Sequence, residues 1–147
     1  MFECRTVVKA PIDVVFDLSL CIDAHVESMS ASGERAVAGV TVGIIGLGEQ
    51  VTWRARHFGI PFRMTSKIVE LDRPSYFVDE QVSGPFHKFR HEHHFEMDDG
   101  ETTMIDRVSF TAPFGVLGRI AERIALASYL PKLIEDRNRF LKTAAER

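Results

Sequence analysis

Two histidines and one aspartate carry the most specific chemical signal in the sequence. His91 and His93 lie two positions apart in a segment that alternates apolar and polar residues, so both side chains point to one face of a strand. With Asp99-Gly100 as a two-residue turn, Asp106 of the next strand lies opposite His93. A carboxylate raises the pKa of a neighbouring imidazole and fixes its tautomer, which suits general-base catalysis or contact with a ligand hydroxyl. His93 and Asp106 are therefore the catalytic candidates, and the alternative is a satisfied polar pair that closes one end of the core.

The His91-Glu92-His93 segment also has a spacing that suits metal ligands. Two imidazoles on one strand face provide two ligands, but the following Glu96 points to the opposite face. A third inward ligand would have to come from His57 or from an aspartate. We therefore expect neither a bound metal ion nor a cofactor.

These residues depend for their positions on a series of short alternating strands joined by turns. Consecutive strands with tight turns indicate an antiparallel meander. The predicted strands of the meander cover residues 50–57, 62–68, 76–83, 88–96 and 102–110.

Turn lengths predict which residues face each other across this meander. A two-residue turn at Gly59-Ile60 pairs His57 with Phe62, Ala55 with Met64 and Trp53 with Ser66.

A three-residue turn at residues 84–86 places Asp79 opposite His91 and Phe77 opposite His93. The inward face then carries two His/Asp neighbours among aromatic side chains. The same register sends four apolar residues to the outer face, which leaves either a β-bulge or an apolar patch for self-association as the explanation. These four residues are Val69, Leu71, Tyr76 and Val78.

Helices are expected at both ends of the meander. Pro11 suits the first turn of a short helix that reaches about Leu18, and residues 21–29 read as a second one. Residues 113–139 have the periodicity of a long amphipathic helix, with Pro131 expected to kink it. A kinked helix against a sheet leaves a gap, which we interpret as a ligand cavity. The apolar stripe of this helix comprises Leu117, Ile120, Ile124, Ala127, Leu130, Ile134 and Leu141.

Composition limits the classes of protein that fit. The 147 residues, 45% of them hydrophobic, suffice for one domain with one substantial core, so we expect a single domain over residues 1–147. A formal net charge of -3 makes nucleic acid an unsuitable partner.

No apolar run approaches the roughly 20 residues of a membrane span, and no signal peptide is evident, so we expect no membrane insertion and a cytoplasmic location. The glycine-rich residues 43–48 lead into a strand, which does not fit a nucleotide-binding loop.

Several segments have the residue pattern of one known superfamily. They include VVKAPIDVVFD at residues 7–17, LGEQVTWRARHFG at residues 47–59 and GPFHKFRHEHHF at residues 84–95, with residues 106–108 and 113–115. Over essentially its full length the chain resembles the START-like, or Bet v 1-like, helix-grip superfamily. The resemblance is greatest to bacterial SRPBCC proteins of the polyketide cyclase/dehydrase and lipid-transport type.

This resemblance implies an α+β helix-grip fold, in which a curved antiparallel sheet wraps around a long C-terminal helix, with two short helices near the N-terminus. It also implies an elongated, mostly apolar cavity between sheet and helix. Mapped onto this sequence, the ligand-binding residues would be Trp53, Ala55, His57, Met64, Ser66, Phe77, Asp79, His91, His93, Met104, Asp106 and Phe110, with Ile120 and Ile124 from the helix.

The function implied first is the binding or carrying of a hydrophobic small molecule of lipid or polyketide type. The alternative is a polyketide cyclase or dehydratase in which His93, oriented by Asp106, removes a proton from a carbonyl substrate. A third alternative is a homodimer or interaction subunit that uses the apolar outer patch around Val78. Relatives of one fold differ in activity, so the resemblance alone does not choose among them.

Overall fold

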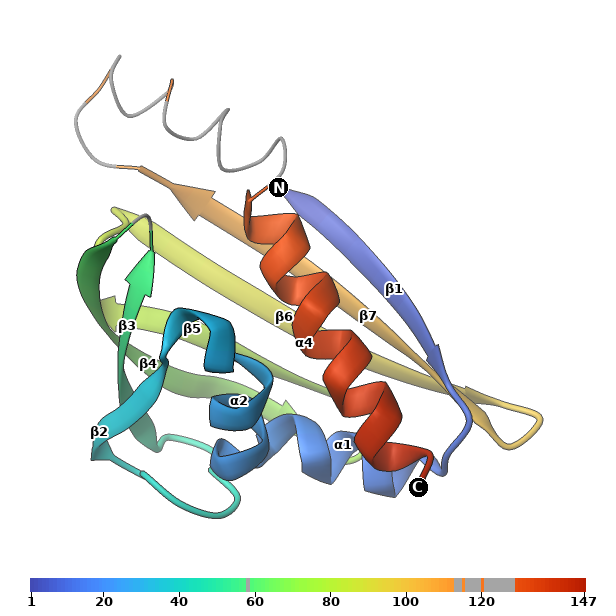
Figure 1. Ribbon diagram of the computed structural model, residues 1–147. Coiled ribbons are helices and arrows are strands. Elements are labelled where there is room, and N and C mark those ends of the chain that lie inside the picture. Colours follow the sequence, from blue (N-terminus) through green and yellow to red (C-terminus); the bar gives the residue numbers. More distant parts are fainter. Residues whose placement is uncertain (58, 113–114, 116–119, 121–128) are drawn as a thin grey trace.

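The strands of the chain form one antiparallel sheet against which the helices pack. The structure is a computed structural model that describes residues 1–57, 59–112, 115, 120 and 129–147. Within these residues, the sheet has seven strands in the order β1-β7-β6-β5-β4-β3-β2. Figure 1 shows the elements, which are β1 (Phe2–Val8), α1 (Ile12–Leu20), α2 (Ile22–Ser28), the 3-10 turn η1 (Ser30–Ser32), β2 (Arg35–Gly39), β3 (Gln50–His57), β4 (Ile60–Asp72), β5 (Tyr76–Ser83), β6 (Lys88–Asp98), β7 (Glu101–Thr111) and α4 (Leu130–Ala145).

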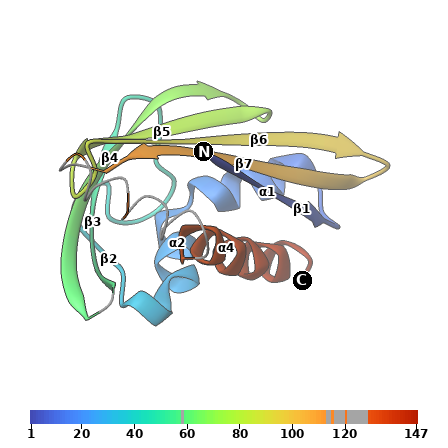
Figure 2. The same ribbon diagram turned by 90° about the horizontal axis from the view of Figure 1, so that it is seen from above.

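The sheet is curved, and the labelled helices lie on its concave side. In Figure 2, β5, β6 and β7 run along one side of the molecule, while β2 and β3 bend around towards α2 and α4. The strand order explains this shape, because each hairpin adds its right-handed twist to that of its neighbour. The expected α+β helix-grip architecture is therefore confirmed.

The strands that carry the histidines pair as the turns predict. His93 pairs with Asp106 and His91 with Val108 across β6 and β7. Across β5 and β6, Asp79 pairs with His91 and Phe77 with His93. The inward faces of the three strands therefore coincide.

The predicted register of the β3–β4 hairpin is wrong by two residues. His57 pairs with Ile60, Ala55 with Phe62 and Trp53 with Met64. Gly59 has a φ of 74°, which a residue without Cβ adopts readily, so Ile60 is free to begin β4. A shift of two residues preserves the face of each side chain, and the inward set is unchanged.

A bulge in β4 explains part of the apolar outer face that the predicted register produced. The β4–β5 register shifts between Ile68 and Glu70, which brings Leu71 back to the inside, where it packs against the core. Val78 still points outward but is completely buried. Its neighbours across the sheet are Glu70 and Glu92, and Arg90 binds both of these carboxylates. These long charged side chains cover Val78 with their aliphatic parts.

The C-terminal helix is described from Leu130 onward, with Pro131 in its first turn. The kink expected at Pro131 involves the turn before this proline, most of which lies outside the described residues. The expected stripe residues Leu117, Ile124 and Ala127 lie outside the described residues, as does most of the expected helix before Tyr129. Farther along α4, Leu141 is buried as expected and joins Phe16, Phe95 and other apolar residues in the core.

Candidate ligand-binding site

A cavity of about 590 Å³ lies between the sheet and α4. Most of its wall is aliphatic or aromatic, and this composition suits an apolar ligand. The sheet contributes Val51, Phe62, Ile68, Phe77, Phe89 and Phe110, the N-terminal helices contribute Leu20 and Ile22, and α4 contributes Leu130, Leu133 and Ile134.

Ten of the fourteen residues that the sequence places at a ligand lie on this wall. They are Trp53, Ala55, His57, Met64, Ser66, Phe77, Asp79, His91, His93 and Phe110. Their common position follows from strand alternation, which directs every second side chain of β3 to β7 into the concave face.

The other four residues lie elsewhere. Met104 is buried in the core, where the Ser19 hydroxyl contacts its sulfur at 3.8 Å. Asp106 faces inward but is covered by the side chains that bind it. Ile120 is 53% exposed, and Ile124 lies outside the described residues.

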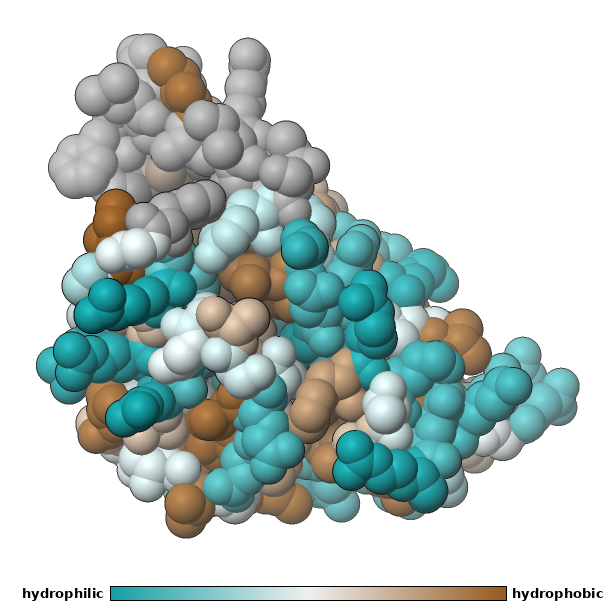
Figure 3. Space-filling model, in the orientation of Figure 1, coloured by the Kyte–Doolittle hydropathy of each residue, from teal (hydrophilic) through white to brown (hydrophobic). Residues whose placement is uncertain are grey.

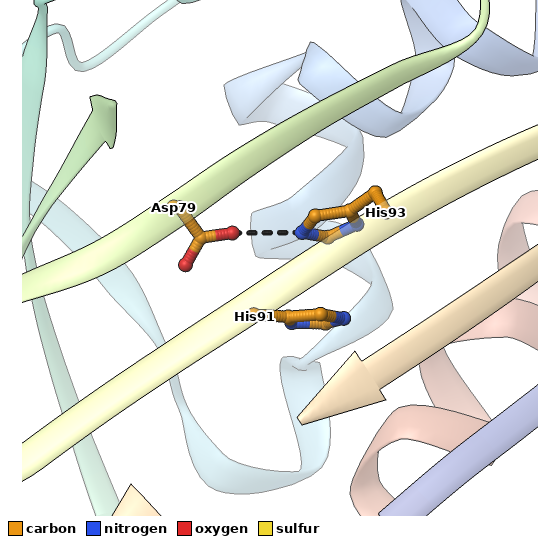
Figure 4. A group of neighbouring side chains, drawn as sticks. All are labelled: Asp79, His91 and His93. Carbon is orange, nitrogen blue, oxygen red and sulfur yellow. Dashed lines mark hydrogen bonds and ion pairs between the residues drawn. The ribbon is translucent and has the colours of Figure 1, made fainter. Parts of the chain in front are cut away.

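The polar part of the wall is a cluster of two histidines and two aspartates. His91 Nε2 donates to Asp106 Oδ1 at 2.8 Å, and His93 Nε2 donates to Asp79 Oδ2 at 2.7 Å. Figure 4 shows the Asp79 carboxylate of β5 directed at the ring of His93 on β6, with His91 beside it. The two imidazole rings are stacked with their centroids 3.7 Å apart. The cluster therefore joins three neighbouring strands.

The hydrogen bonds do not follow the pairing expected from the strand register. His93 and Asp106 are opposite each other on the backbone, but His93 Nδ1 lies 3.5 Å from Asp106 Oδ1, while the shorter bond of Asp106 is to His91. Each histidine thus binds the aspartate diagonal to it, which is possible because side chains in a sheet lean along the strand. The nearest carboxylate partner of His93 is therefore Asp79.

Asp106 is further held by two residues of α4 that the sequence analysis did not identify. Asn138 Nδ2 donates to Asp106 Oδ2 at 2.6 Å, and Arg137 Nη1 lies 3.4 Å from Asp106 Oδ1. Arg137 also donates to Asn138 Oδ1 at 2.9 Å. A sequence signal for Asn138 existed, because it lies four residues after Ile134 and three before Leu141, on the same apolar stripe.

Burial and hydrogen bonding set the charges of this cluster. Burial lowers the pKa of His93 to about 3, with an added contribution from His91, and Asp79 only partly opposes this decrease. Burial alone would raise the pKa of Asp106, but hydrogen bonding to His91 and the positive charge of Arg137 hold it well below its usual range. In Asp79 burial likewise favours a higher pKa, but the hydrogen bond and electrostatic effect of His93, together with His91 and Arg137, outweigh it and lower the pKa. At neutral pH the cluster therefore holds two carboxylates and an uncharged His93.

The cavity wall also carries polar residues away from the His/Asp cluster, one of them beside the single tryptophan. The ring of His25 lies 4.3 Å from that of Trp53, and its Nε2 is 2.6 Å from Glu34 Oε1. His57 is hydrogen-bonded to the hydroxyl of Tyr129, and burial lowers its pKa. Glu34 and Tyr129 carry no sequence signal for this role, since each lies outside the alternating meander.

The residues described so far could do two things for a ligand. The aromatic and aliphatic wall can bind an apolar body, and the His/Asp cluster can orient a polar group at one place on it. Asp79, His91 and His93 also each offer a possible metal ligand atom, and these atoms lie within 4.8 Å of one another. In the described part of the chain, no helix is long and apolar enough to cross a membrane.

A curved antiparallel sheet that holds a helix over an internal apolar cavity defines the helix-grip class of ligand-binding proteins. The sequence matches the family described as "Polyketide cyclase / dehydrase and lipid transport" over residues 8–135, and the chain belongs to this family. The expected START-like, SRPBCC assignment is confirmed. No curated protein matches the chain.

Solved structures share this fold at low sequence identity. The protein TTHA0849 from Thermus thermophilus is 14% identical, with a TM-score of 0.75 and coverage of 97% of each chain. Zhui aromatase/cyclase from a Streptomyces species is 17% identical, with a TM-score of 0.73, over 99% of this chain and 93% of that one. A START superfamily protein from Mycobacterium smegmatis is 12% identical, with a TM-score of 0.72, and the match covers 99% of this chain and 96% of that one. At these identities the similarity establishes the fold alone.

Proposed function

We propose that residues 1–147 form a single domain that binds or carries a hydrophobic small molecule of lipid or polyketide type in the cavity between the sheet and α4. The observation that carries this proposal is the cavity itself. Its volume of about 590 Å³ falls in the range of roughly 300–1,000 Å³ typical of small-molecule sites. The apolar wall supplies affinity, and the His/Asp cluster orients one polar group of the ligand.

Two measurements test the carrier proposal. Native mass spectrometry of the purified protein, compared with the denatured sample, is expected to reveal a co-purifying hydrophobic molecule. Because Trp53 is the single tryptophan and lies on the cavity wall, titration of delipidated protein with a fatty acid is expected to change its fluorescence saturably. A clean apo mass together with an unchanged Trp53 spectrum for fatty acids and aromatic polyketides would refute the proposal.

An enzyme of the cyclase or dehydratase kind is the second candidate. It is favoured by the placement of His93, hydrogen-bonded to a carboxylate, at the wall of an apolar cavity. Similarity to an aromatase/cyclase gives the class of substrate to try first. In this function His93 accepts a proton from the carbon next to a carbonyl group, and Asp79 orients the ring through Nε2.

The Asp79→Asn variant separates the two functions. In a carrier we expect a modest loss of affinity, since the volume of the side chain is kept. In an enzyme we expect a large loss of turnover, roughly 10²-fold or more, with the ligand still bound. The readouts are Trp53 fluorescence for binding and single-turnover conversion of a poly-β-keto thioester for catalysis. Glu80→Gln, next in β5 and directed to the outer face, serves as the matched control.

The third alternative, self-association through an outer apolar patch, has less support. Val78, the centre of that patch, is covered by Arg90 and its acidic partners. Figure 3 shows the other side of the molecule, which carries α2 and α4, and there hydrophilic side chains cover much of the coloured surface, with small hydrophobic groups between them. The proposed carrier therefore acts without an interface at Val78.

A further inference from the structure

We propose that Asp79, His91 and His93 bind one divalent first-row transition-metal ion, such as Zn²⁺, Co²⁺ or Fe²⁺, at the cavity wall. Two imidazoles and one carboxylate are a donor set that these ions accept, and such a set leaves coordination positions open to other molecules. The expectation of no metal rested on the lack of a third inward ligand. Asp79 supplies that ligand, because it lies opposite His91 on the neighbouring strand.

The distances within the group suit ligands of one ion. His93 Nε2 and Asp79 Oδ2 are 2.7 Å apart, close to the roughly 3 Å that separates two adjacent ligands at bond lengths of about 2.1 Å. The potential ligand atoms of all three residues lie within 4.8 Å of one another. In Figure 4 the Asp79 carboxylate and the His93 nitrogen face each other directly. An ion between them would take the place of the hydrogen atom that they now share.

Asp106 provides the outer support that metal-binding histidines commonly have. Because it accepts a hydrogen bond from His91 Nε2, it leaves Nδ1 of that ring as the ligand atom. When His93 binds the ion through Nε2, its proton moves to Nδ1, which lies 3.5 Å from Asp106 Oδ1. One carboxylate, held by Asn138 and Arg137, thus orients both rings.

Charge also favours a cation at this place. Among the described residues, the carboxylates of Asp79 and Asp106 face the guanidinium group of Arg137, and these three groups together carry a net charge of -1. The stacked rings, with planes 19° apart, do not direct their lone pairs to one point. Binding therefore requires the His91 ring to turn about its Cβ–Cγ bond while its Nε2 stays within hydrogen-bond reach of Asp106. The site does not depend on the carrier function, since the ion can bind while the rest of the cavity is empty.

Cobalt is the probe that tests the site. Protein without a histidine tag is stripped with a chelator and titrated with Co²⁺, while visible d–d absorption is recorded. We expect saturation at one ion per chain and displacement by Zn²⁺, with the bound zinc quantified by elemental analysis. An absence of stoichiometric Co²⁺ and Zn²⁺ binding would overturn the proposal.

Variants assign the bound ion to these residues. We expect His93→Gln and Asp79→Asn to weaken Zn²⁺ binding by more than about 100-fold, and Asp106→Asn to weaken it by roughly 10–100-fold. His94→Gln is the matched control, because His94 lies on the other face of the same strand, and it should bind as the parent does. Retention of full affinity in Asp79→Asn would overturn the assignment, and this variant preserves side-chain volume should His93→Gln fail to fold.

Two binding measurements on the same protein distinguish this proposal from the carrier function. Trp53 fluorescence, recorded without added metal, measures fatty-acid binding in the apolar cavity, and Co²⁺ absorption measures metal binding. Fatty-acid binding without Co²⁺ binding would refute the metal site alone. Co²⁺ binding without any response to hydrophobic ligands would refute the carrier function alone.

Discussion

At the scale of single residues, His93 couples protonation to stability. It is buried beside Asp79, Asp106 and the ring of Phe77, which is stacked on it at 4.0 Å. Its cationic form has lost the water that would hydrate it, and burial therefore outweighs the attraction of the nearby carboxylates. The imidazole of His93 therefore takes up a proton less readily in the folded protein than in the unfolded chain.

We expect the free energy of unfolding to fall as the pH is lowered from about 6.5. The pKa of His93 is about 3 in the folded state against 6.5 in the unfolded chain. Between these values the unfolded state binds the extra proton, so each pH unit of acidification lowers the free energy of unfolding by up to about 1.4 kcal/mol. Asp106, whose pKa is depressed by its partners, adds a further loss only at lower pH, below the usual carboxyl range. Urea unfolding measured at a series of pH values checks this slope.

The His93→Gln variant identifies the source of the slope. It removes the titrating group, so the decline from about pH 6.5 to about pH 4 should flatten. His94→Gln, on the opposite face of β6, should keep the slope. An unchanged slope in His93→Gln would assign the pH dependence to other groups.

At the scale of elements, three arginines lie side by side on the outer face of the sheet. Arg54 of β3 pairs with Arg35 of β2 and with Arg63 of β4, and all three are exposed. None of them takes part in the ion pairs found among the described residues. Like charges directly opposite each other on neighbouring strands destabilise a sheet.

We expect Arg54→Glu to raise the free energy of unfolding by about 1 kcal/mol. The substitution turns two repulsive cross-strand pairs into two attractive ones, each worth roughly 0.2–1 kcal/mol. Urea unfolding at low salt measures the gain, which should shrink at high salt because these charges are exposed. Arg54→Gln, which removes repulsion without adding attraction, should fall between the two. A loss of stability in Arg54→Glu at low salt would contradict this account.

Particular elements show how far the sequence predicts the structure. The β6–β7 register was predictable because Asp99 and Gly100, with φ of 50° and 78°, form the tight turn that their residue types favour. The β4 bulge was one of two explanations that the sequence left open, since no glycine or proline marks its position and only packing against the core requires it. The diagonal His/Asp bonds depend on side-chain rotamers, which alternation does not specify. Asn138 could have been found from its helical position, but its bond to Asp106 needed the fold.

At the scale of the whole molecule, the cavity is space that the core leaves unfilled. Ala55 is a small, buried residue of β3 on its wall, where a larger side chain has room to extend. A larger apolar side chain at this position would occupy volume that a ligand needs. It would also bury more apolar area, which stabilises the folded state.

We expect Ala55→Leu to abolish most fatty-acid binding while the protein stays folded. The added carbons occupy the volume that the ligand needs, so affinity should fall by at least about tenfold, and the free energy of unfolding should stay equal or rise by roughly 1–2 kcal/mol. Trp53 fluorescence and urea unfolding provide the two readouts. Ala38→Leu, at an exposed position of β2, is the control. Unchanged binding with a marked loss of stability would mean that the space beside Ala55 is already filled.

The pairing of β1 with β7 governs the order in which the protein can form. Phe2 pairs with Val108, so this ladder joins segments roughly a hundred residues apart. The hairpins from β3 to β7 need only local contacts and can form within microseconds. During synthesis, β1 and α1 emerge from the ribosome long before β7 exists, and the buried side chains of Val8 and Phe16 stay exposed to solvent until it does. The β1–β7 ladder consequently cannot close before β7 has been made, and until then the newly made chain exposes apolar side chains through which it can aggregate.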